Sequence, residues 1–182
     1  GAANIVVMQE RAGGRAAARG AISHAALDHL AGLHIIESIG GMPAAADYIK
    51  NKLPEVVNTQ SGDLGEILAS EYITQRTDFV VPIKKLLWKD DRNTTMRGND
   101  VIAGRDTSGT WTTLKAEVKS RDRLGQTVVD EAITDLRKHS GRPNPSSLAF
   151  ISSRLREQER HAEAKRYEAL QRRSPAPHEI EH

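Results

Sequence analysis

The 182-residue sequence contains no cysteine, so it can form neither a disulfide nor a thiolate metal site. It has no apolar run that approaches the length of a membrane-spanning helix. Its first residues also lack the basic-then-apolar order of a secretory signal. These absences lead us to expect a cytoplasmic protein with no membrane partner.

The rest of the composition is that of a folded, water-soluble chain. Apolar residues make up 38% and charged residues 27% of the sequence, a balance typical of globular proteins. The formal net charge is +2, which is compatible with a nucleic-acid partner without indicating one. The length is sufficient for one well-buried domain with an appended helical part.

Hydropathy patterns predict an α/β fold. We expect strands at 4–8, 79–88, 100–105, 109–120 and 147–152, and helices at 21–39, 43–52, 61–76, 125–140 and 153–173. In this interpretation residues 1–60 are an N-terminal helical elaboration, residues 61–152 are the core, and residues 153–182 are a C-terminal helix and tail.

Two of the predicted strands are joined by the segment DTSG at 106–109, a strong hairpin signal. Because side chains alternate along a strand, the second strand has an apolar face and a charged face. The apolar face consists of Leu114, Ala116 and Val118, and the charged face consists of Lys115, Glu117 and Lys119. A row of charges on a strand that should pack into a domain requires a partner or a function.

The register of this hairpin decides which acidic residues meet. A turn that pairs Arg105 with Thr110 places Asp100 on the same face as Glu117, with the two backbones roughly 7–8 Å apart along the diagonal. A loop one residue longer or shorter would turn Asp100 to the opposite face. The prediction of a carboxylate pair therefore depends on the parity of the register.

Two carboxylates at this spacing repel each other unless one is protonated or a cation lies between them. Magnesium binds a few carboxylate oxygens and keeps several waters. Lys119 points to the same place, where an ammonium group can hold an attacking water or stabilise a developing negative charge. Glu66, near the start of the helix expected at 61–76, can add a further metal ligand. Such a combination suits phosphodiester hydrolysis.

These residues also carry a resemblance to a known family. The segments GEILASEYI, MRGNDVIAG and LKAEVKSR together resemble the HamA nuclease subunit of Hachiman antiphage defence systems, within the PD-(D/E)xK nuclease superfamily. The resemblance covers residues 61–151. It departs from the superfamily pattern at Asn99, where that pattern has a proline before the aspartate.

The resemblance implies a restriction-endonuclease-like core, which is a helix, a three-strand meander, a helix and a strand. It implies that Glu66, Asp100, Glu117 and Lys119 are catalytic, and that the three carboxylates bind Mg²⁺ or Mn²⁺. It also implies that DNA is the substrate and that a helicase subunit is the partner. The alternatives are a non-cleaving nuclease-fold module that binds DNA or the helicase, and a restriction or junction-resolving nuclease.

Each candidate residue also has a purely structural interpretation. Glu66 can complete a capping box with Asp63 at the start of its helix. Asp100 can cap the turn before it, and Glu117 and Lys119 can be solvated residues of an edge strand.

Basic residues lie on either side of the candidate site in the sequence. We expect four of them to contact phosphates, namely Lys89, Arg97, Arg121 and Arg123. The alternative is that they are solvated charges. Aromatic residues make up 4% of the chain, which argues against base stacking as the main mode of binding.

Overall fold

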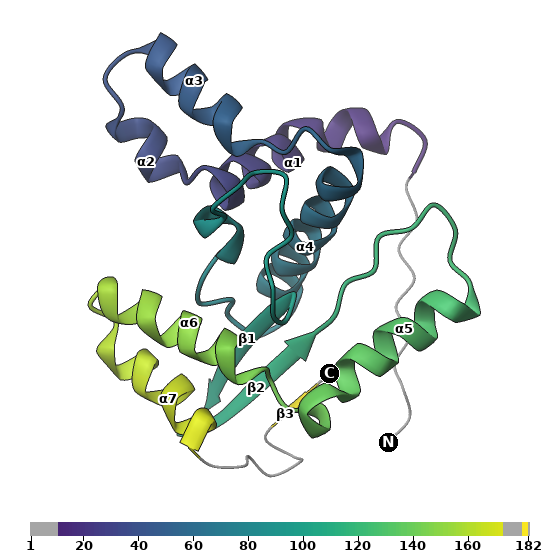
Figure 1. Cartoon of the computed structure of the whole chain (residues 1–182), viewed down its shortest axis with the longest axis vertical. Coiled ribbons are helices and arrows are strands. Elements are labelled where there is room, and N and C mark those ends of the chain that lie inside the picture. The colour runs from purple at the N-terminus through teal and green to yellow at the C-terminus, as the bar shows by residue number, and fades with distance from the viewer. Residues whose placement is uncertain (1–10, 173–179, 182) are drawn as a thin grey trace.

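The computed structural model describes residues 11–172 and 180–181 (Figure 1). Along the chain the elements are α1 (Gly14–Leu30), α2 (Leu33–Ser38), α3 (Met42–Lys52), α4 (Val57–Arg76), the short 3₁₀ helix η1 (Lys85–Trp88), β1 (Val101–Thr107), β2 (Thr110–Ala116), α5 (Gln126–Arg137), the 3₁₀ turn η2 (Lys138–Gly141), α6 (Pro145–Glu157), α7 (His161–Arg172) and β3 (Ile180–Glu181). The fold is mixed α/β. The strand expected at 4–8 lies outside the described residues.

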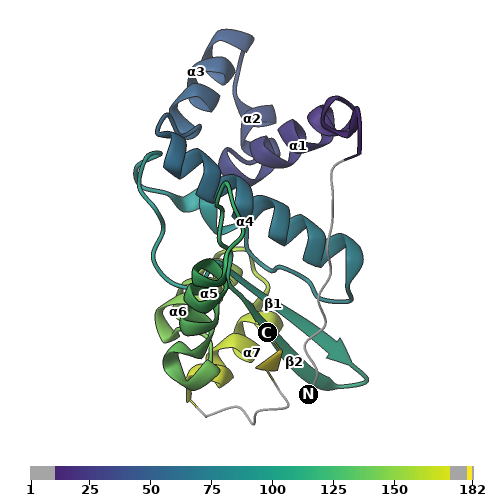
Figure 2. The same ribbon diagram turned by 90° about the vertical axis from the view of Figure 1, so that its right-hand side faces the viewer.

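The β1–β2 hairpin is the middle layer of the molecule. Val101 and Ala103 on one face of β1 pack against Ile73 of α4. Ile102 on the other face packs against Leu155 of α6 and its neighbours on α7. Figures 1 and 2 both show α1–α3 at one end of the molecule and α6–α7 at the other. Both faces of β1 are therefore covered by helices.

A smaller apolar cluster attaches the N-terminal helices to this layer. It joins Leu30 of α1, Ile67 of α4 and Leu86 of η1. None of the described helices is both long and apolar enough to span a membrane.

The hairpin turn consists of Ser108 and Gly109, whose φ angles of 51° and 85° suit a two-residue turn between twisted strands. The observed register pairs Arg105 with Thr112. The expected pairing with Thr110 is therefore wrong by two residues. Because this error is even, every side chain of the hairpin keeps its predicted face.

The strand expected at 79–88 is largely absent from the described structure. Val80 forms an isolated antiparallel bridge with Gly104, and the segment then continues into η1. The three-strand meander is thus reduced to one bridge beside the hairpin. At the other edge of the sheet, Ile180 pairs in parallel with Thr113.

The strand expected at 147–152 is helical, and this prediction is wrong. The helix α6 begins after Asn144, whose side chain accepts a hydrogen bond from the Ser146 N–H and caps the helix. Leu148, Ile151 and Leu155 are buried, at a helical spacing that a six-residue window is too short to distinguish from a strand. The described residues therefore contain the helix, hairpin and helix of the expected core, without its last strand.

Gly104 allows an aromatic ring to lie directly on β1. A Cβ at Gly104 would lie 2.1 Å from Cζ2 of Trp111 and 2.8 Å from Oη of Tyr167. Trp111 and Tyr167 pack edge to face, with ring centroids 5.6 Å apart. We expect Gly104→Ala to lower the free energy of unfolding by about 1–3 kcal/mol, because the rings must shift, as measured by urea denaturation.

The matched control for this change is Gly62→Ala. Gly62 lies inside α4, and a Cβ there meets no atom within 4 Å. This variant should be more stable than the wild type by about 0.5–1 kcal/mol. Equal stability of the Gly104→Ala variant and the wild type would contradict the packing described here.

Candidate functional site

Asp100 lies immediately before β1, one residue beyond the last ladder pair of Val101 with Ala116. Its Oδ2 accepts a hydrogen bond from the Val118 N–H at 2.7 Å. This bond links the two chain segments just past the point where the ladder stops. The bond places the carboxylate beside the residue that follows Glu117, and Asp100 also lines a cavity with Glu66. The negative charge of Asp100 contributes to the raised pKa of both glutamates. Asp100 is thus the residue that connects the two parts of the site.

Glu66 reaches the site from α4, which approaches the hairpin closely at Gly65. A Cβ at Gly65 would lie only 2.9 Å from Cγ1 of Val118, so a glycine permits this contact. Glu66 is 8% exposed, and its Oε2 lies 2.9 Å from Nζ of Lys85. The two groups form a close ion pair whose side chains are only 15% and 10% exposed.

Burial raises the pKa of Glu66 to about 7, with a smaller contribution from Asp100, and Lys85 opposes the shift. Desolvation disfavours the charged carboxylate more strongly than the ammonium of Lys85 favours it. A metal cation can contact this oxygen only after Lys85 moves away from it.

The structure excludes the capping-box interpretation of Glu66. The helix α4 begins at Val57, so Asp63 lies in its interior rather than at its N-cap. Asp63 is buried and its Oδ2 accepts a hydrogen bond from Lys89 at 2.8 Å.

Glu66 and Asp100 line one small cavity of about 40 Å³, together with Lys85 and Arg97. A polar cavity needs roughly 10–15 Å³ on this measure to hold one water molecule. The cavity therefore has room for a cation or a few waters between the two acids.

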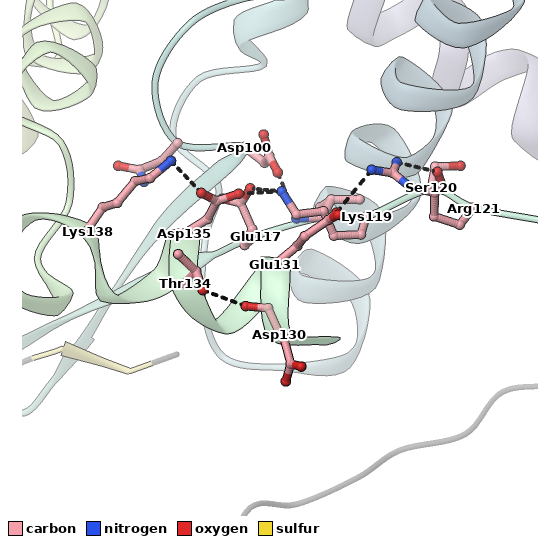
Figure 3. Close-up of polar contacts among 12 residues, drawn as sticks. Asp100, Glu117, Lys119, Ser120, Arg121, Asp130, Glu131, Thr134, Asp135 and Lys138 are labelled. Atoms are coloured by element: carbon pink, nitrogen blue, oxygen red, sulfur yellow. Dashed lines mark hydrogen bonds and ion pairs between the residues drawn. The ribbon is translucent and has the colours of Figure 1, made fainter. Parts of the chain in front are cut away.

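Glu117 and Lys119 lie near Asp100 and beside Asp135, which is in the last turn of α5 (Figure 3). Nζ of Lys119 donates to Oε1 of Glu117 at 2.7 Å and to Oδ2 of Asp135 at 2.5 Å. Oδ1 of Asp135 is also 2.5 Å from Nζ of Lys138. These two lysines lower the pKa of Asp135. Burial raises the pKa of Glu117, and the negative charges of Asp100 and Asp135 raise it further against the effect of Lys119.

Lys115, the first residue of the charged face, is fully buried. Its Nζ donates to the carbonyl oxygens of Asp135, Leu136 and Lys138 at 3.3, 2.8 and 3.1 Å. These carbonyls belong to the end of α5, where a cation is favoured by the helix dipole and satisfies groups left unpaired by the helix. The charged face of β2 thus binds the C-terminal end of α5.

The four predicted catalytic residues form two neighbouring sets rather than one cluster. Glu66 approaches from the α4 side of the hairpin, whereas Glu117 and Lys119 lie on the α5 side, and Asp100 interacts with both sets. Within the described part of the chain, no three His, Asp or Glu side chains are already arranged to hold a metal ion.

The four basic residues expected to contact phosphates differ in their positions. Arg97 is exposed and lines the cavity beside Asp100, and Arg123 is exposed. Arg121 is exposed and forms an ion pair of 3.2 Å with Glu131. Lys89 does not fit the expectation, because it is 8% exposed and bound to Asp63, so a DNA phosphate cannot reach it without disrupting that pair.

Three residues of the site have roles that the sequence did not indicate. Lys85 pairs with Glu66, Lys115 binds the end of α5, and Asp135 binds Lys119. The only sequence signal for Lys115 is its place on the charged face of β2. Lys85 and Asp135 are distant in sequence from their partners, so only the folded chain brings them into contact.

Comparison with known proteins places the chain in a family. The model of the family described as HamA matches residues 18–182. The chain belongs to the HamA family. The Hachiman protein HamA of Bacillus cereus is 34% identical over 105 residues, which make up 58% of this chain and 36% of that protein. The aligned region thus covers about a third of that HamA protein.

The raised pKa of Glu66 predicts a pH dependence of stability for this HamA-family chain. The folded state holds a proton at Glu66 up to about pH 7, whereas the unfolded state releases it near the ordinary glutamate pKa of 4.5. Stability from this group is therefore present below the unfolded pKa and lost as pH rises toward 7. In the wild type we expect the free energy of unfolding to decline by up to about 3 kcal/mol over this range because of Glu66. The Glu66→Gln variant should lack this decline, as measured by urea denaturation between pH 4.5 and 8.

Glu71→Gln, on the same helix, is the control for this measurement. Burial alone would raise the pKa of Glu71, but its hydrogen bonds, with His29 first among them, lower the pKa below its ordinary value. Glu71 therefore affects the free energy of unfolding only at acidic pH. The Glu71→Gln variant should keep the decline between pH 5 and 7. If the free energies of unfolding of the wild type and of Glu66→Gln change in parallel with pH, the raised pKa of Glu66 is contradicted.

Proposed function

We propose that this chain is a metal-dependent DNA endonuclease subunit of Hachiman antiphage defence that works with a helicase subunit. The proposal rests on the position of Asp100, which lines a cavity with Glu66 and accepts a hydrogen bond from the Val118 N–H, next to Glu117 in the chain. Lys119 in turn binds Glu117. Family membership supports it, because HamA of Bacillus cereus is described as a Hachiman protein.

The residues present fit a divalent metal ion such as Mg²⁺ or Mn²⁺. Magnesium is usually bound by one or two carboxylates and retains several waters, so it needs no preformed set of three protein ligands. Asp100 and Glu66 line one cavity, and a cation bound there would replace Lys85 as the positive charge beside Glu66. Glu117 is the third candidate ligand. When bound, the metal would activate water and neutralise negative charge on the phosphate.

The side chains around this position have complementary roles in the proposed reaction. Lys119 would hold the attacking water or stabilise the negative charge that develops on the phosphate. Arg97, at the rim of the cavity, would contact the DNA backbone. Lys85, which pairs with Glu66 in the metal-free protein, would move away from it when the metal binds.

The superfamily assignment belongs to this proposal as well. The helix α4, the hairpin and α5 follow the order of a PD-(D/E)xK core, and Asp100, Glu117 and Lys119 occupy the positions of its motif. The bridge at Val80 stands where that core has a full strand. We propose that the chain is a reduced version of this core.

A non-cleaving module that binds DNA or the helicase is the second candidate. The observation in its favour is that no three acidic or histidine side chains of the described residues are preassembled for a metal. In that case Glu117 and Lys119 would only stabilise the contact between β2 and α5.

Nicking of supercoiled plasmid distinguishes the two candidates. The chain, alone and with its helicase subunit, is incubated with the plasmid and Mg²⁺ or with EDTA. We expect nicking that requires the metal and that falls by about 100-fold or more in Glu117→Ala/Lys119→Ala, because that variant loses a ligand and the charge-stabilising group.

The control is Glu157→Gln on α6, where the exposed carboxylate forms an ion pair of 2.7 Å with Arg154. This variant should nick at the wild-type rate. Equal nicking by the double variant and the wild type would reject the catalytic assignment. Binding of DNA without metal-dependent nicking by any form would support the non-cleaving module.

A further inference from the structure

The hydrogen bonds of β2 do not fix the position of Lys119, because Lys119 lies beyond the end of that strand. The β2 ladder ends at Ala116, three residues before Lys119. A lysine side chain outside a ladder loses up to about 2 kcal/mol of rotamer entropy when it is held in one conformation. Other groups must therefore hold the ammonium where the proposed chemistry needs it.

Two carboxylates hold this ammonium group, and they come from different elements. Glu117 precedes Lys119 by two residues on the same segment, whereas Asp135 lies in the last turn of α5 (Figure 3). The side chain of Lys119 is 18% exposed and that of Asp135 is 24% exposed, so the pair is partly shielded from water.

The two carboxylates are not equivalent in the proposed reaction. When Glu117 binds a divalent cation, its carboxylate can no longer neutralise Lys119, and the added positive charge repels the ammonium. Asp135 is then the remaining carboxylate in contact with Lys119. We propose that Asp135 is a positioning residue that holds Lys119 in place while Glu117 binds the metal. This inference rests on the proposed function.

The placement of Asp135 depends on polar contacts rather than on a buried apolar face. Every residue of α5 is at least partly exposed, and Val129 and Ile133 are each 38% exposed. Lys115 instead fixes the end of the helix through its three carbonyl contacts, at the same turn that carries Asp135. Two lysines of the charged face thus contact the C-terminal end of α5. Lys115 binds its backbone carbonyls, and Lys119 binds the carboxylate of Asp135.

Asp135→Asn tests the inference, because it removes the charge and keeps the shape. Asp130→Asn on the same helix is the matched control, since the Asp130 carboxylate accepts a hydrogen bond from Gln126 of the same helix. The first readout is the rate at which sulfo-NHS acetate acylates Lys119, followed by peptide mass spectrometry in a Glu117→Gln background, which removes the charge of Glu117 from Lys119 as a bound cation would. We expect Asp135→Asn to raise this rate several-fold and Asp130→Asn to leave it unchanged.

The second readout is plasmid nicking with Mg²⁺. We expect Asp135→Asn to lower kcat by about 10- to 100-fold, as for a misplaced catalytic group, with KM for DNA unchanged. Asp135→Glu, which keeps the charge, should restore part of the rate. A role limited to stability would instead lower the thermal midpoint of both Asp135 variants equally without a kcat effect specific to Asp135→Asn.

The outcomes separate this inference from the proposed function. Unchanged acylation of Lys119 in Asp135→Asn, or an equal change in Asp130→Asn, would overturn the positioning role whatever the activity. Faster acylation without any nicking by the wild type would show that Asp135 holds Lys119 and would overturn its role in catalysis together with the proposed function.

Discussion

The register of the β1–β2 hairpin is the constraint on which the arrangement of the site depends. Val101 opposite Ala116 directs Lys115 toward α5 and brings Asp100 next to the segment that carries Glu117. A slip of one residue would turn Lys115 into the apolar cluster on the α4 face, where an unpaired ammonium would be strongly unfavourable. The register is therefore fixed by buried charge as well as by apolar packing.

Two ion pairs between α4 and the segment around η1 differ in their burial. Lys89 binds Asp63 and the carbonyl of Arg92, and both charged side chains are at most 6% exposed. The side chains of Lys85 and Glu66 are 15% and 10% exposed and line a cavity. The first pair is enclosed by the packing of the fold, whereas the second borders a space that water can enter.

The elements that the sequence predicted correctly are those with long periodic patterns or strong turn signals. The helices at 43–52 and 125–140 and the hairpin around 106–109 are confirmed in type, with shifted ends. The strand expected at 147–152 failed because its apolar residues also fit a helix that continues to Glu157, beyond the window considered. The strand expected at 79–88 failed because its Pro82 and two lysines lead the chain into η1 after one bridge.

The sequence by itself determined the alternation of faces on β2 and the parity that keeps Asp100 within reach of Glu117, because both follow from the two-residue period of a strand and a short turn. Only the tertiary structure decided that Glu66 pairs with Lys85 and that Asp135 pairs with Lys119. It also decided that Lys89 is bound to Asp63 and is therefore unavailable to a DNA phosphate. These contacts join residues 16 to 26 positions apart in the chain on separate elements. Their formation depends on how the helices pack against the hairpin, and local periodicity carries no information about that packing.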